Sequence, residues 1–473
     1  MIAGLKPYAE YKDSGLPWLG QVPAHWRTVR NGSLFSQRSQ TGFAELPILE
    51  VSLKTGVQVR AFGSAKRKQV MSDLAKYKRA AKGDLAYNTM RMWQGALGVC
   101  PVDGLVSPAY VVARPYAGVE PQYFAALFRT GDYMAEIDAA SRGIVKDRNR
   151  LYWDQFKQMQ SPCPPPDEQS AIVRFLEWAN GRLGRAIRAK RRVISLLNEQ
   201  KKVVVHNAIS KGIDPLATLK ASGIAWLGDI PQHWEAARLK RVLVGKLTNG
   251  LFKRGDAYGS GVPLVNVANL YSPDNKIRTG KLERVRATPK EIETFRVMQG
   301  DVFFVRSSLK FEGTGRCSFI ESVQPGTVFE CHVVRARPDQ RIALPRFIAT
   351  FLASWVGVNN TVSRANTVTM STLTQGSLSS LPMVIPPLVE QSEILRSLDS
   401  ALKPLERAVS RLEREIELLH EYRTRLVAEV VTGKLDVREA AACLPEDVTA
   451  DAETDHVDES DDPELIEEEA TEA

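Results

Sequence analysis

The stretch EQSAIVRFLEWANGRLGRAIRAKRRVISLLNEQKKVVVHNA, from Glu168 to Ala208, decides the fold of this chain. Its apolar or small residues recur in steps of four and three, with Lys190 filling one position of the pattern. These residues are Ile172, Leu176, Ala179, Leu183, Ala186, Val193 and Leu197. Most residues between them are charged or polar. So narrow a stripe predicts one long helix whose heptad seam is buried by a partner helix.

A second stretch supplies that partner. It repeats the three-four alternation at Leu395, Leu398, Leu402, Leu405, Val409, Leu412, Ile416 and Leu419. A helix of about 40 residues is about 60 Å long, so the pair is expected to act as a strut between two other bodies. The alternative is two ordinary core helices of one large domain. Pro404 lies inside the second seam and either kinks this helix or marks its start.

The chain contains a tandem duplication. The lead-in motif, defined here as residues 12–26, returns as residues 220–234 at an offset of 208. Its repeated residues are Lys12, Ser14, Gly15, Trp18, Leu19, Gly20, Pro23, His25 and Trp26. The start of the first long helix returns at an offset of 222, where Glu168 and Gln169 match Glu390 and Gln391. The repeating unit is therefore a lead-in motif, a variable domain and a proline-flanked helix.

The two variable domains, residues 27–160 and 235–380, share a short landmark. Gly83-Asp84 and Gly300-Asp301 each predict a turn that leads into a strand. Further strands are predicted at residues 46–53, 109–113, 262–267, 316–320 and 328–334, and helices at 121–130 and 345–356. The predicted fold class is α+β, with two mixed α/β domains in tandem and two long coiled-coil helices.

Charge points to a polyanionic partner. The net charge is +8, but residues 444–473 hold fourteen acidic and no basic side chains, so the remainder carries +22. A strongly basic body favours nucleic acid. The acidic tail is expected to be disordered and solubilising, or alternatively an electrostatic brake on the basic surface.

Targeting and cysteine signals are weak. No apolar run approaches the roughly 18 residues of a membrane helix, and the first residues lack a signal core, so a cytoplasmic protein without a membrane partner is expected. The five cysteines stand far apart, which favours neither a disulfide framework nor a metal cluster.

Both variable domains are basic, with net charges of +9 and +10. Lysine and arginine clusters suit phosphates, and an arginine fork or asparagine amide near a strand end can read a base edge. The predicted DNA-binding residues are Lys66, Lys68, Asn88, Arg91, Arg148, Arg306, Ser307, Lys310 and Arg316. For any one of the cations, the alternative is a solvated surface side chain.

The histidines of the lead-in motifs have another interpretation. His25 and His233 stand beside tryptophans, and neither has a nucleophile or carboxylate nearby in the sequence. We interpret them as hydrogen-bonding caps, and the tryptophans as anchors that fix each motif on its domain.

Together these residues carry a family resemblance. The run PPPDEQ (Pro164–Gln169) opens a heptad helix, SKGIDP (Ser210–Pro215) follows it, and KASGIAWLGDIPQHW (Lys220–Trp234) comes next. This pattern resembles the specificity subunit of a type I restriction–modification system, over residues 11–436. The resemblance implies two target-recognition domains separated by an antiparallel helix pair, with each domain reading one half of a split DNA target.

The resemblance also implies the division of the chain and its partners. Residues 1–160 and 216–385 would be target-recognition domains with their lead-in motifs, and residues 161–215 and 386–440 spacer helices. Residues 441–473, the acidic tail, have no counterpart expected from the family. The coiled coil, through residues such as Leu183, Leu197, Leu405, Leu412 and Leu419, would dock two methylation subunits, with restriction subunits outside them. S-adenosylmethionine, ATP and Mg²⁺ are expected on those partners and no cofactor on this chain.

Catalytic motifs are missing from the sequence. Neither proline run has the polar and aromatic neighbours of an adenine methyltransferase motif, and no G-x-x-x-x-G-K-[ST] loop is present. The favoured hypothesis is a non-catalytic subunit that binds double-stranded DNA. The alternatives are a stand-alone coiled-coil nuclease with an unrecognised active site and a purely structural coiled-coil protein.

Overall fold

The computed structural model describes residues 5–60, 74–142, 149–224, 226–272, 274–308, 313–364, 366–367 and 371–445. They form two compact units. Unit 1 comprises residues up to Lys190 and from Arg414 onwards, and unit 2 runs from Arg191 to Glu413. The long helices α4 (Pro166–Lys211) and α9 (Leu388–Val431) each contribute to both units. Each unit therefore joins segments that lie far apart in the sequence.

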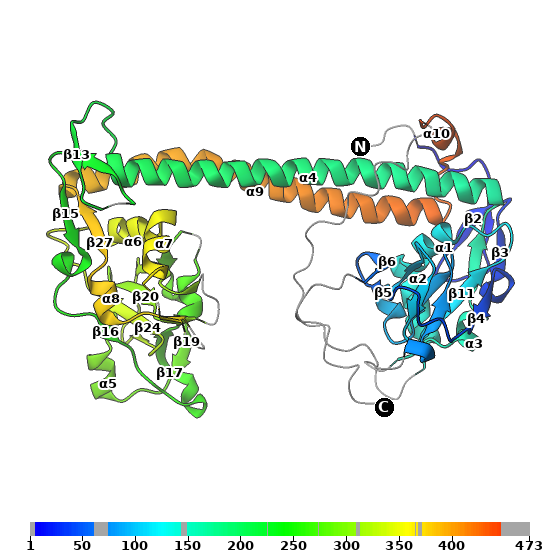
Figure 1. Cartoon of the computed structure of the whole chain (residues 1–473), viewed down its shortest axis with the longest axis horizontal. Coiled ribbons are helices and arrows are strands. Elements are labelled where there is room, and N and C mark those ends of the chain that lie inside the picture. Colours follow the sequence, from blue (N-terminus) through cyan, green and yellow to red (C-terminus); the bar gives the residue numbers. More distant parts are fainter. Residues whose placement is uncertain are drawn as a thin grey trace. The chain divides into compact units, whose positions relative to one another are not determined.

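Unit 1 is built on a four-stranded antiparallel sheet in the order β4–β11–β8–β9 (Figure 1). These strands are Phe35–Arg38, Tyr110–Pro115, Leu85–Asn88 and Leu97–Val99. The smaller strand pairs are β5 (Leu49–Ser52) with β6 (Gly56–Val59), and β7 (Lys78–Ala80) with β10 (Gly104–Val106). The helices are α1 (Pro121–Phe128), α2 (Gly131–Ala140) and α3 (Trp153–Phe156). Buried aromatic side chains, Phe35, Tyr87, Phe124, Phe128 and Phe156, fill the space between sheet and helices.

Unit 2 repeats this plan with more strands. Its five-stranded sheet has the order β16–β24–β20–β22–β18, which are Thr248–Asn249, Val333–Ala336, Val302–Val305, Cys317–Ile320 and Lys276–Ile277. Two three-stranded sheets are β19–β17–β23 (Glu283–Val285, Tyr258–Val265, Val328–Phe329) and β21–β26–β25 (Ser307–Ser308, Ser371–Thr372, Asn366–Thr367). The helices are α5 (Pro289–Thr294), α6 (Pro345–Ala353), α7 (Trp355–Val362) and α8 (Gln375–Ser379).

Hydrogen bonding confirms the duplication. Each lead-in motif forms a hairpin, β1 (Tyr11–Asp13) with β2 (Gln21–Pro23) and β13 (Leu219–Ala221) with β14 (Asp229–Pro231). Each variable domain is then closed by a strand pair that joins its first residues to a strand at or just beyond its end. These pairs are β3 (Arg27–Arg30) with β12 (Gln160–Cys163) and β15 (Glu235–Arg238) with β27 (Pro382–Ile385).

The two Gly-Asp turns are confirmed as starts of central strands. Gly83 and Gly300 adopt φ angles of 86° and 84°, which favour glycine. The carboxylates of Asp84 and Asp301 accept a hydrogen bond from the backbone N–H three residues earlier, at 2.8 Å in both cases. The other predicted elements are also present. The single strand expected at 328–334 is instead two strands, β23 and β24, and the helix expected at 345–356 ends at Ala353 because Ser354 caps α7.

The end of α9 returns to the start of unit 1. Gly433 follows this helix with a φ angle of 77°, and a Cβ atom there would lie 2.4 Å from Cδ of Pro23. Asp436 then bridges to Lys6, and the helix α10 (Arg438–Ala442) follows. A side chain larger than hydrogen at position 433 is excluded by this close approach. The acidic residues beyond Pro445 lie outside the described part of the chain.

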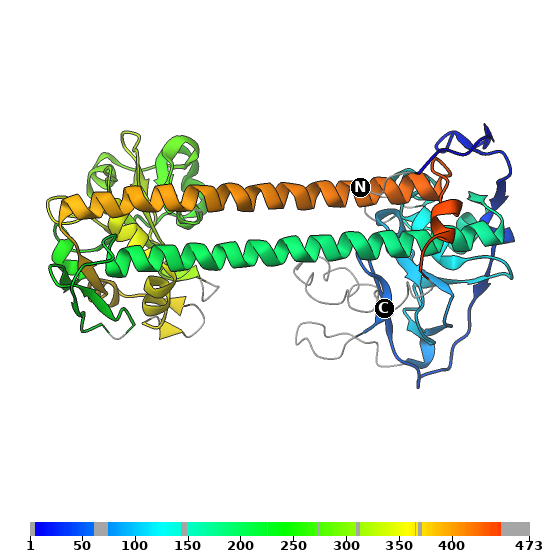
Figure 2. The same ribbon diagram turned by 90° about the horizontal axis from the view of Figure 1, so that it is seen from above.

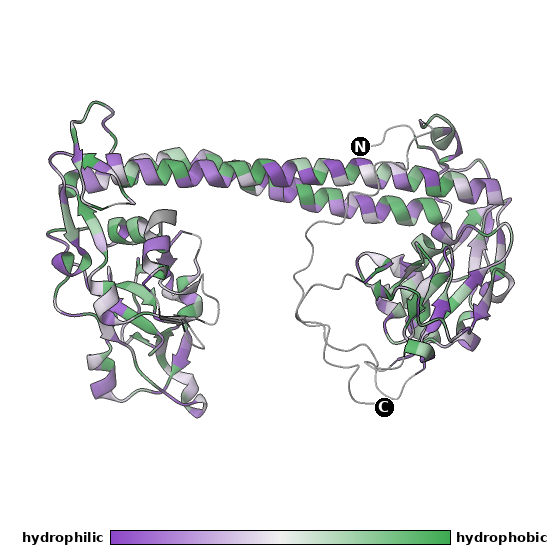
Figure 3. Cartoon of the chain, viewed as in Figure 1, coloured by the Kyte–Doolittle hydropathy of each residue, from purple (hydrophilic) through white to green (hydrophobic). Residues whose placement is uncertain are grey.

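The long helices pack as a coiled coil, and their contacts run antiparallel (Figure 2). In unit 1, Lys190 Nζ lies 2.5 Å from Glu415 Oε2, and Arg423 Nε donates to Asn180 Oδ1 at 3.0 Å. In unit 2, Lys201 Nζ lies 3.4 Å from Glu406 Oε1. The five predicted seam leucines are shielded: Leu183 is buried, and Leu197, Leu405, Leu412 and Leu419 are half-buried. Figure 3 shows hydrophilic and hydrophobic residues interleaved along both helices, as a narrow seam requires.

The predicted seam of α4 is partly wrong. Ile187 is buried instead of Ala186, and Val193 is 44% exposed, whereas Ile194 is half-buried. The observed seam takes two successive four-residue steps, from Ala179 through Leu183 to Ile187. Such a stutter shifts the stripe by one position.

The second helix follows the predicted seam throughout, and Pro404 does not mark its start. α9 begins at Leu388 and continues through this proline. Proline has no N–H, so the carbonyl of Ser400 receives no helical hydrogen bond from residue 404.

The register correction can be tested by two alanine variants. Ile187→Ala should lower the free energy of unfolding by about 2–5 kcal/mol, because it removes a buried side chain from the seam. Val193→Ala should change it by less than about 0.5 kcal/mol, as at other exposed positions. Denaturant unfolding of both variants measures the difference. A larger loss for Val193→Ala would restore the originally predicted register.

Candidate nucleic-acid interface

The first lead-in motif is held by one carboxylate at the start of α4. Glu168, only 5% exposed, accepts hydrogen bonds from Tyr8 Oη (2.6 Å), His25 Nε2 (2.7 Å) and Trp26 Nε1 (2.9 Å). Burial and this hydrogen bond raise the pKa of the Tyr8 hydroxyl, so it stays protonated and donates. His25 therefore does have a carboxylate partner, 143 residues away in the sequence. The pair has a positioning role, since it anchors the motif.

The second lead-in motif repeats part of this arrangement. His233 Nε2 lies 2.7 Å from Glu390 Oε2, and Glu390 is 18% exposed. Trp234 is buried like Trp26, but its Nε1 has no hydrogen-bond partner among the described residues. The position that corresponds to Tyr8 is Leu216, which is almost fully exposed. The second carboxylate thus makes fewer contacts than the first.

The adjacent glutamines fix each variable domain to its helix. Gln169 Oε1 accepts from the backbone N–H of Glu120 (2.9 Å), the residue before α1. Gln391 Oε1 accepts from the backbone N–H of Leu344 (2.8 Å), the residue before α6. Both glutamines also donate, at 2.8 Å, to a carbonyl of the preceding proline run. Sequence reasoning detected the repeated Glu-Gln pair but could not assign these partners.

In unit 1, two predicted DNA-binding residues lie at the end of the central strand β8 and just after it. Asn88 is buried, its amide nitrogen lies 3.4 Å from Tyr110 Oη, and its Oδ1 accepts from the backbone N–H of Met90 at 3.0 Å. These contacts close the turn and direct the amide inward. Arg91 is half-buried and precedes the short 3-10 helix η3 (Met92–Gln94). Arg91 stays a candidate reader of bases.

In unit 2, Arg306 lies between the strands β20 and β21, and Ser307 begins β21. The backbone carbonyl of Arg306 accepts from the N–H of Leu373, as that of Thr89 does from the N–H of Leu151, both at 2.9 Å. Thr89, and not Arg91, is therefore the counterpart of Arg306. Ser307 Oγ lies 3.1 Å from Nδ1 of His332, an exposed residue that sequence reasoning did not select.

Arg316 lies beside the end of β20, since its carbonyl accepts from the backbone N–H of Val305 at 2.9 Å. Its guanidinium donates to the carbonyl of Leu270 (3.2 Å) and stands over the ring of Tyr271, 4.9 Å from its centre. Arg306, Ser307 and Arg316 thus come together in unit 2, as Asn88 and Arg91 do in unit 1. Lys66, Lys68, Arg148 and Lys310 lie outside the described residues.

Two kinds of reactive group among the described residues bear on catalysis, metal-binding clusters and reactive thiols. No group of three or more His, Cys, Asp or Glu side chains among these residues could hold a metal ion. Burial raises the pKa of the Cys100 thiol to about 12, and it also raises that of Cys317, so neither is a reactive thiolate. No helix in this part of the chain is long and apolar enough to cross a membrane.

Comparison with known proteins gives consistent relatives, although no protein-family model matches the chain. The StySPI specificity subunit of a type I restriction enzyme from Salmonella potsdam is 22% identical over 327 residues, which are 68% of this chain and 67% of that protein. The EcoKI specificity subunit from Escherichia coli K12 is 20% identical over 327 residues, 68% of each chain. This chain is a homologue of type I specificity subunits.

A solved structure confirms the fold of this specificity-subunit homologue. A chain from a structure of a type I restriction–modification system, determined to explain complex assembly and conformational transition, aligns with a TM-score of 0.64. It is 17% identical, and the alignment covers 88% of this chain and 99% of that one.

The anchoring carboxylates can be tested as a matched pair. Glu168→Gln should lower the free energy of unfolding of unit 1 by about 1.5–3 kcal/mol, because it weakens three hydrogen bonds to a buried charge. Glu390→Gln should cost unit 2 less, because Trp234 makes no such bond. Hydrogen exchange at the amides of α1 and α6 reports on the two units separately. Equal losses in the two units would contradict this difference.

Proposed function

We propose that this chain is the non-catalytic DNA-recognition subunit of a type I restriction–modification complex. The observation that carries the proposal is the duplication itself. Two basic domains of the same plan are each fixed to a long helix by the same Glu-Gln pair. A chain with two such domains is suited to a target with two halves. The homology to specificity subunits supports this function, and no comparison supports the alternative of a nuclease.

In this proposal, residues 27–160 and 235–380 are the two readers. Most of the affinity would come from phosphate contacts by cations, among which we include Lys66, Lys68, Arg148 and Lys310. Sequence discrimination would come from side chains at the ends of the central strands. Arg91 and Arg306 are suited to guanine, since a guanidinium can donate two hydrogen bonds to its O6 and N7 atoms.

The helix pair would have two roles. α4 passes from unit 1 into unit 2 without a break, so its length would set the spacer between the two half-sites. Its apolar residues Val193, Leu196 and Val203 remain exposed and offer a surface for other subunits. We propose two methylation subunits there and restriction subunits outside them. S-adenosylmethionine, ATP and Mg²⁺ would act on those partners.

Exchange of one domain tests the proposal. Residues 27–160 are replaced by the corresponding domain of another specificity subunit, which leaves the strands β15 and β27 and all of unit 2 unchanged. The chimera should enrich duplexes in which only one half of the target differs from that of the parent chain. Selection from randomised duplexes, with sequencing of the bound pool, measures this directly.

Two results would contradict the proposal. One is a change in both halves, or in neither, after the exchange. The other is cleavage or methylation of DNA by the purified chain alone when Mg²⁺, ATP and S-adenosylmethionine are supplied, because a recognition subunit has no such activity.

A further inference from the structure

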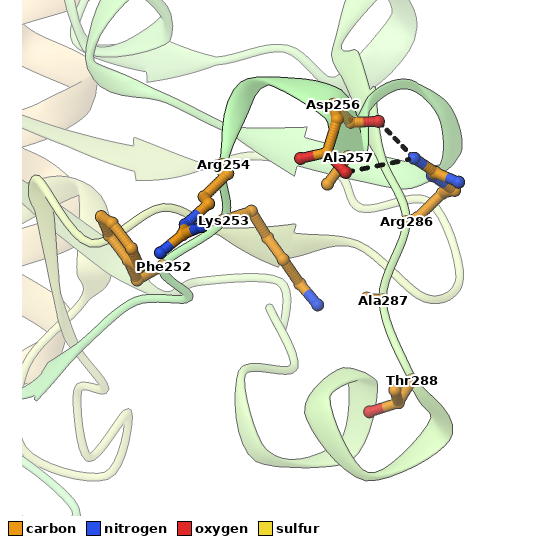
Figure 4. A pocket seen from close by; sticks show the side chains of 8 residues that line it. All are labelled: Phe252, Lys253, Arg254, Asp256, Ala257, Arg286, Ala287 and Thr288. Atoms are coloured by element: carbon orange, nitrogen blue, oxygen red, sulfur yellow. Dashed lines mark hydrogen bonds and ion pairs between the residues drawn. The ribbon is translucent and has the colours of Figure 1, made fainter.

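An open cleft in unit 2 combines an exposed aromatic ring with cations. It has a volume of about 630 Å³. Its lining residues are Phe252, Lys253, Arg254, Asp256, Ala257, Arg286, Ala287 and Thr288 (Figure 4). Three of these side chains are basic and one is acidic, so an anionic ligand is favoured electrostatically.

The cations of the cleft differ in how they are held. Lys253 Nζ lies 2.9 Å from Glu291 Oε2, and Arg286 donates to the backbone carbonyl of Asp256. Arg254 is exposed, and its guanidinium has no hydrogen-bond or ion-pair partner among the described residues. Figure 4 shows Arg254 beside Phe252 on one side of the cleft, whereas Arg286 lies on the other side. Arg254 is therefore available for an anion next to the aromatic ring.

Phe252 is unusual because a large apolar ring is left in solvent. Its side chain is 72% exposed, although the residue before it, Leu251, is buried. Phe43, which follows the equivalent edge strand of unit 1, is half-buried, and the guanidinium of Arg79 stands over its ring at 5.0 Å. No described cation stands over the ring of Phe252. An uncovered ring flanked by basic residues is a common arrangement for contact with nucleic acid bases.

The backbone that carries this ring is tied to the rest of unit 2. The N–H of Leu251 donates to the carbonyl of Phe329 at 2.7 Å, and Leu251 forms a parallel bridge with Glu330. Gly250 lies so close that a Cβ atom there would stand 2.2 Å from the carbonyl oxygen of Glu330. The turn before Phe252 is thus fixed against the segment between β23 and β24. Because this backbone is already ordered, binding of a ligand at Phe252 costs no backbone entropy there.

The segment between β23 and β24 also connects the cleft to Arg306 and Ser307, two of the predicted DNA-binding residues. His332 lies two residues after Glu330, its carbonyl accepts from the N–H of Arg306 at 2.8 Å, and its ring contacts Ser307. Phe252 and Arg306 therefore flank one short stretch, residues 330–332. A duplex that Arg306 and Ser307 read would extend over this region.

We infer that the cleft is a second DNA-contact element of unit 2, in which Phe252 packs against a base step and Arg254 holds an adjoining phosphate. The inference rests on the proposed function, since it names further contacts of the same recognition surface. An aromatic wedge gives sequence preference through apolar contact and base-step deformability, whereas a phosphate contact gives affinity alone.

Two single variants of the full chain separate these roles. The probe is the duplex that the wild-type chain enriches from a randomised library. Phe252→Ala should weaken binding by about ten-fold, the effect of losing one base–aromatic contact, without changing the salt dependence. Arg254→Ala should instead reduce the slope of log affinity against log salt by about one. Selection with Phe252→Ala should lose preference at one or two adjacent positions of a single half-site.

Val244→Ala is the matched control. Val244 is 55% exposed in the same unit. Its N–H donates to the carbonyl of Arg337, which follows β24, whereas Glu330 beside the cleft precedes β24. Val244→Ala should bind DNA as the wild type does. The midpoint of thermal unfolding should be unchanged in both Val244→Ala and Phe252→Ala.

The outcomes distinguish the inference from the proposed function. If the wild-type chain enriches no duplex, both fail. If it enriches a bipartite target but Phe252→Ala binds like Val244→Ala, the cleft is not a DNA-contact element and the proposed function stands. If Phe252→Ala instead weakened the sequence preference equally at all positions of the target, the proposed contact of Phe252 with one base step would also be wrong.

Discussion

The carboxylate of Glu168 is the point at which three parts of unit 1 meet. It is buried at the first turn of α4 and accepts hydrogen bonds from Tyr8, His25 and Trp26. Because the site is buried, these hydrogen bonds are stronger than they would be in water, and losing one is costly. Gln169, next along the helix, fixes the start of α1. Two adjacent side chains therefore orient both the lead-in motif and the variable domain on one helix. A variable domain fixed in this way is coupled to its helix, as the proposed spacer role of the helices would require.

The two copies have diverged at this point, although their backbones match. Unit 2 keeps the contact between His233 and Glu390, but it has no hydroxyl at the position of Tyr8, and the Trp234 N–H is left without a partner in the described part of the chain. A buried donor without an acceptor costs stability. Unit 2 therefore anchors its lead-in motif less firmly. Its strands β25 and β26 pair beside β21, which directly follows Arg306, so the divergence extends to the surface that would read DNA.

Much of the architecture could be predicted from sequence because it depends on local periodicity and on repetition. Apolar residues at heptad spacing predicted both long helices, and glycine followed by aspartate predicted both central strands. The register of α4 could not be predicted, because Ala186 and Ile187 are both apolar and only packing selects between them. Likewise, no local pattern links His25 to Glu168, since their contact forms only when the domain closes.

The candidate site was less predictable than the fold. Asn88 has the chemistry to read adenine, but its burial commits its amide to the turn that follows β8. His332 and Phe252 carried no sequence signal, because an exposed histidine or phenylalanine becomes informative only when its neighbours are known. The candidate arginines Arg91 and Arg306 do not occupy matching positions. The backbone carbonyls of Thr89 and Arg306 accept from the N–H groups of Leu151 and Leu373, so Thr89 and Arg306 correspond.

The central claim is that two duplicated domains in one chain read two halves of one DNA target. The most direct measurement is a genome-wide map of methylated bases in cells that express this chain together with the methylation subunits proposed as its partners. The account predicts a motif of two specified blocks, separated by an unspecified spacer of constant length, that disappears when this chain is deleted. A single contiguous motif, or two blocks at variable spacing, would contradict it.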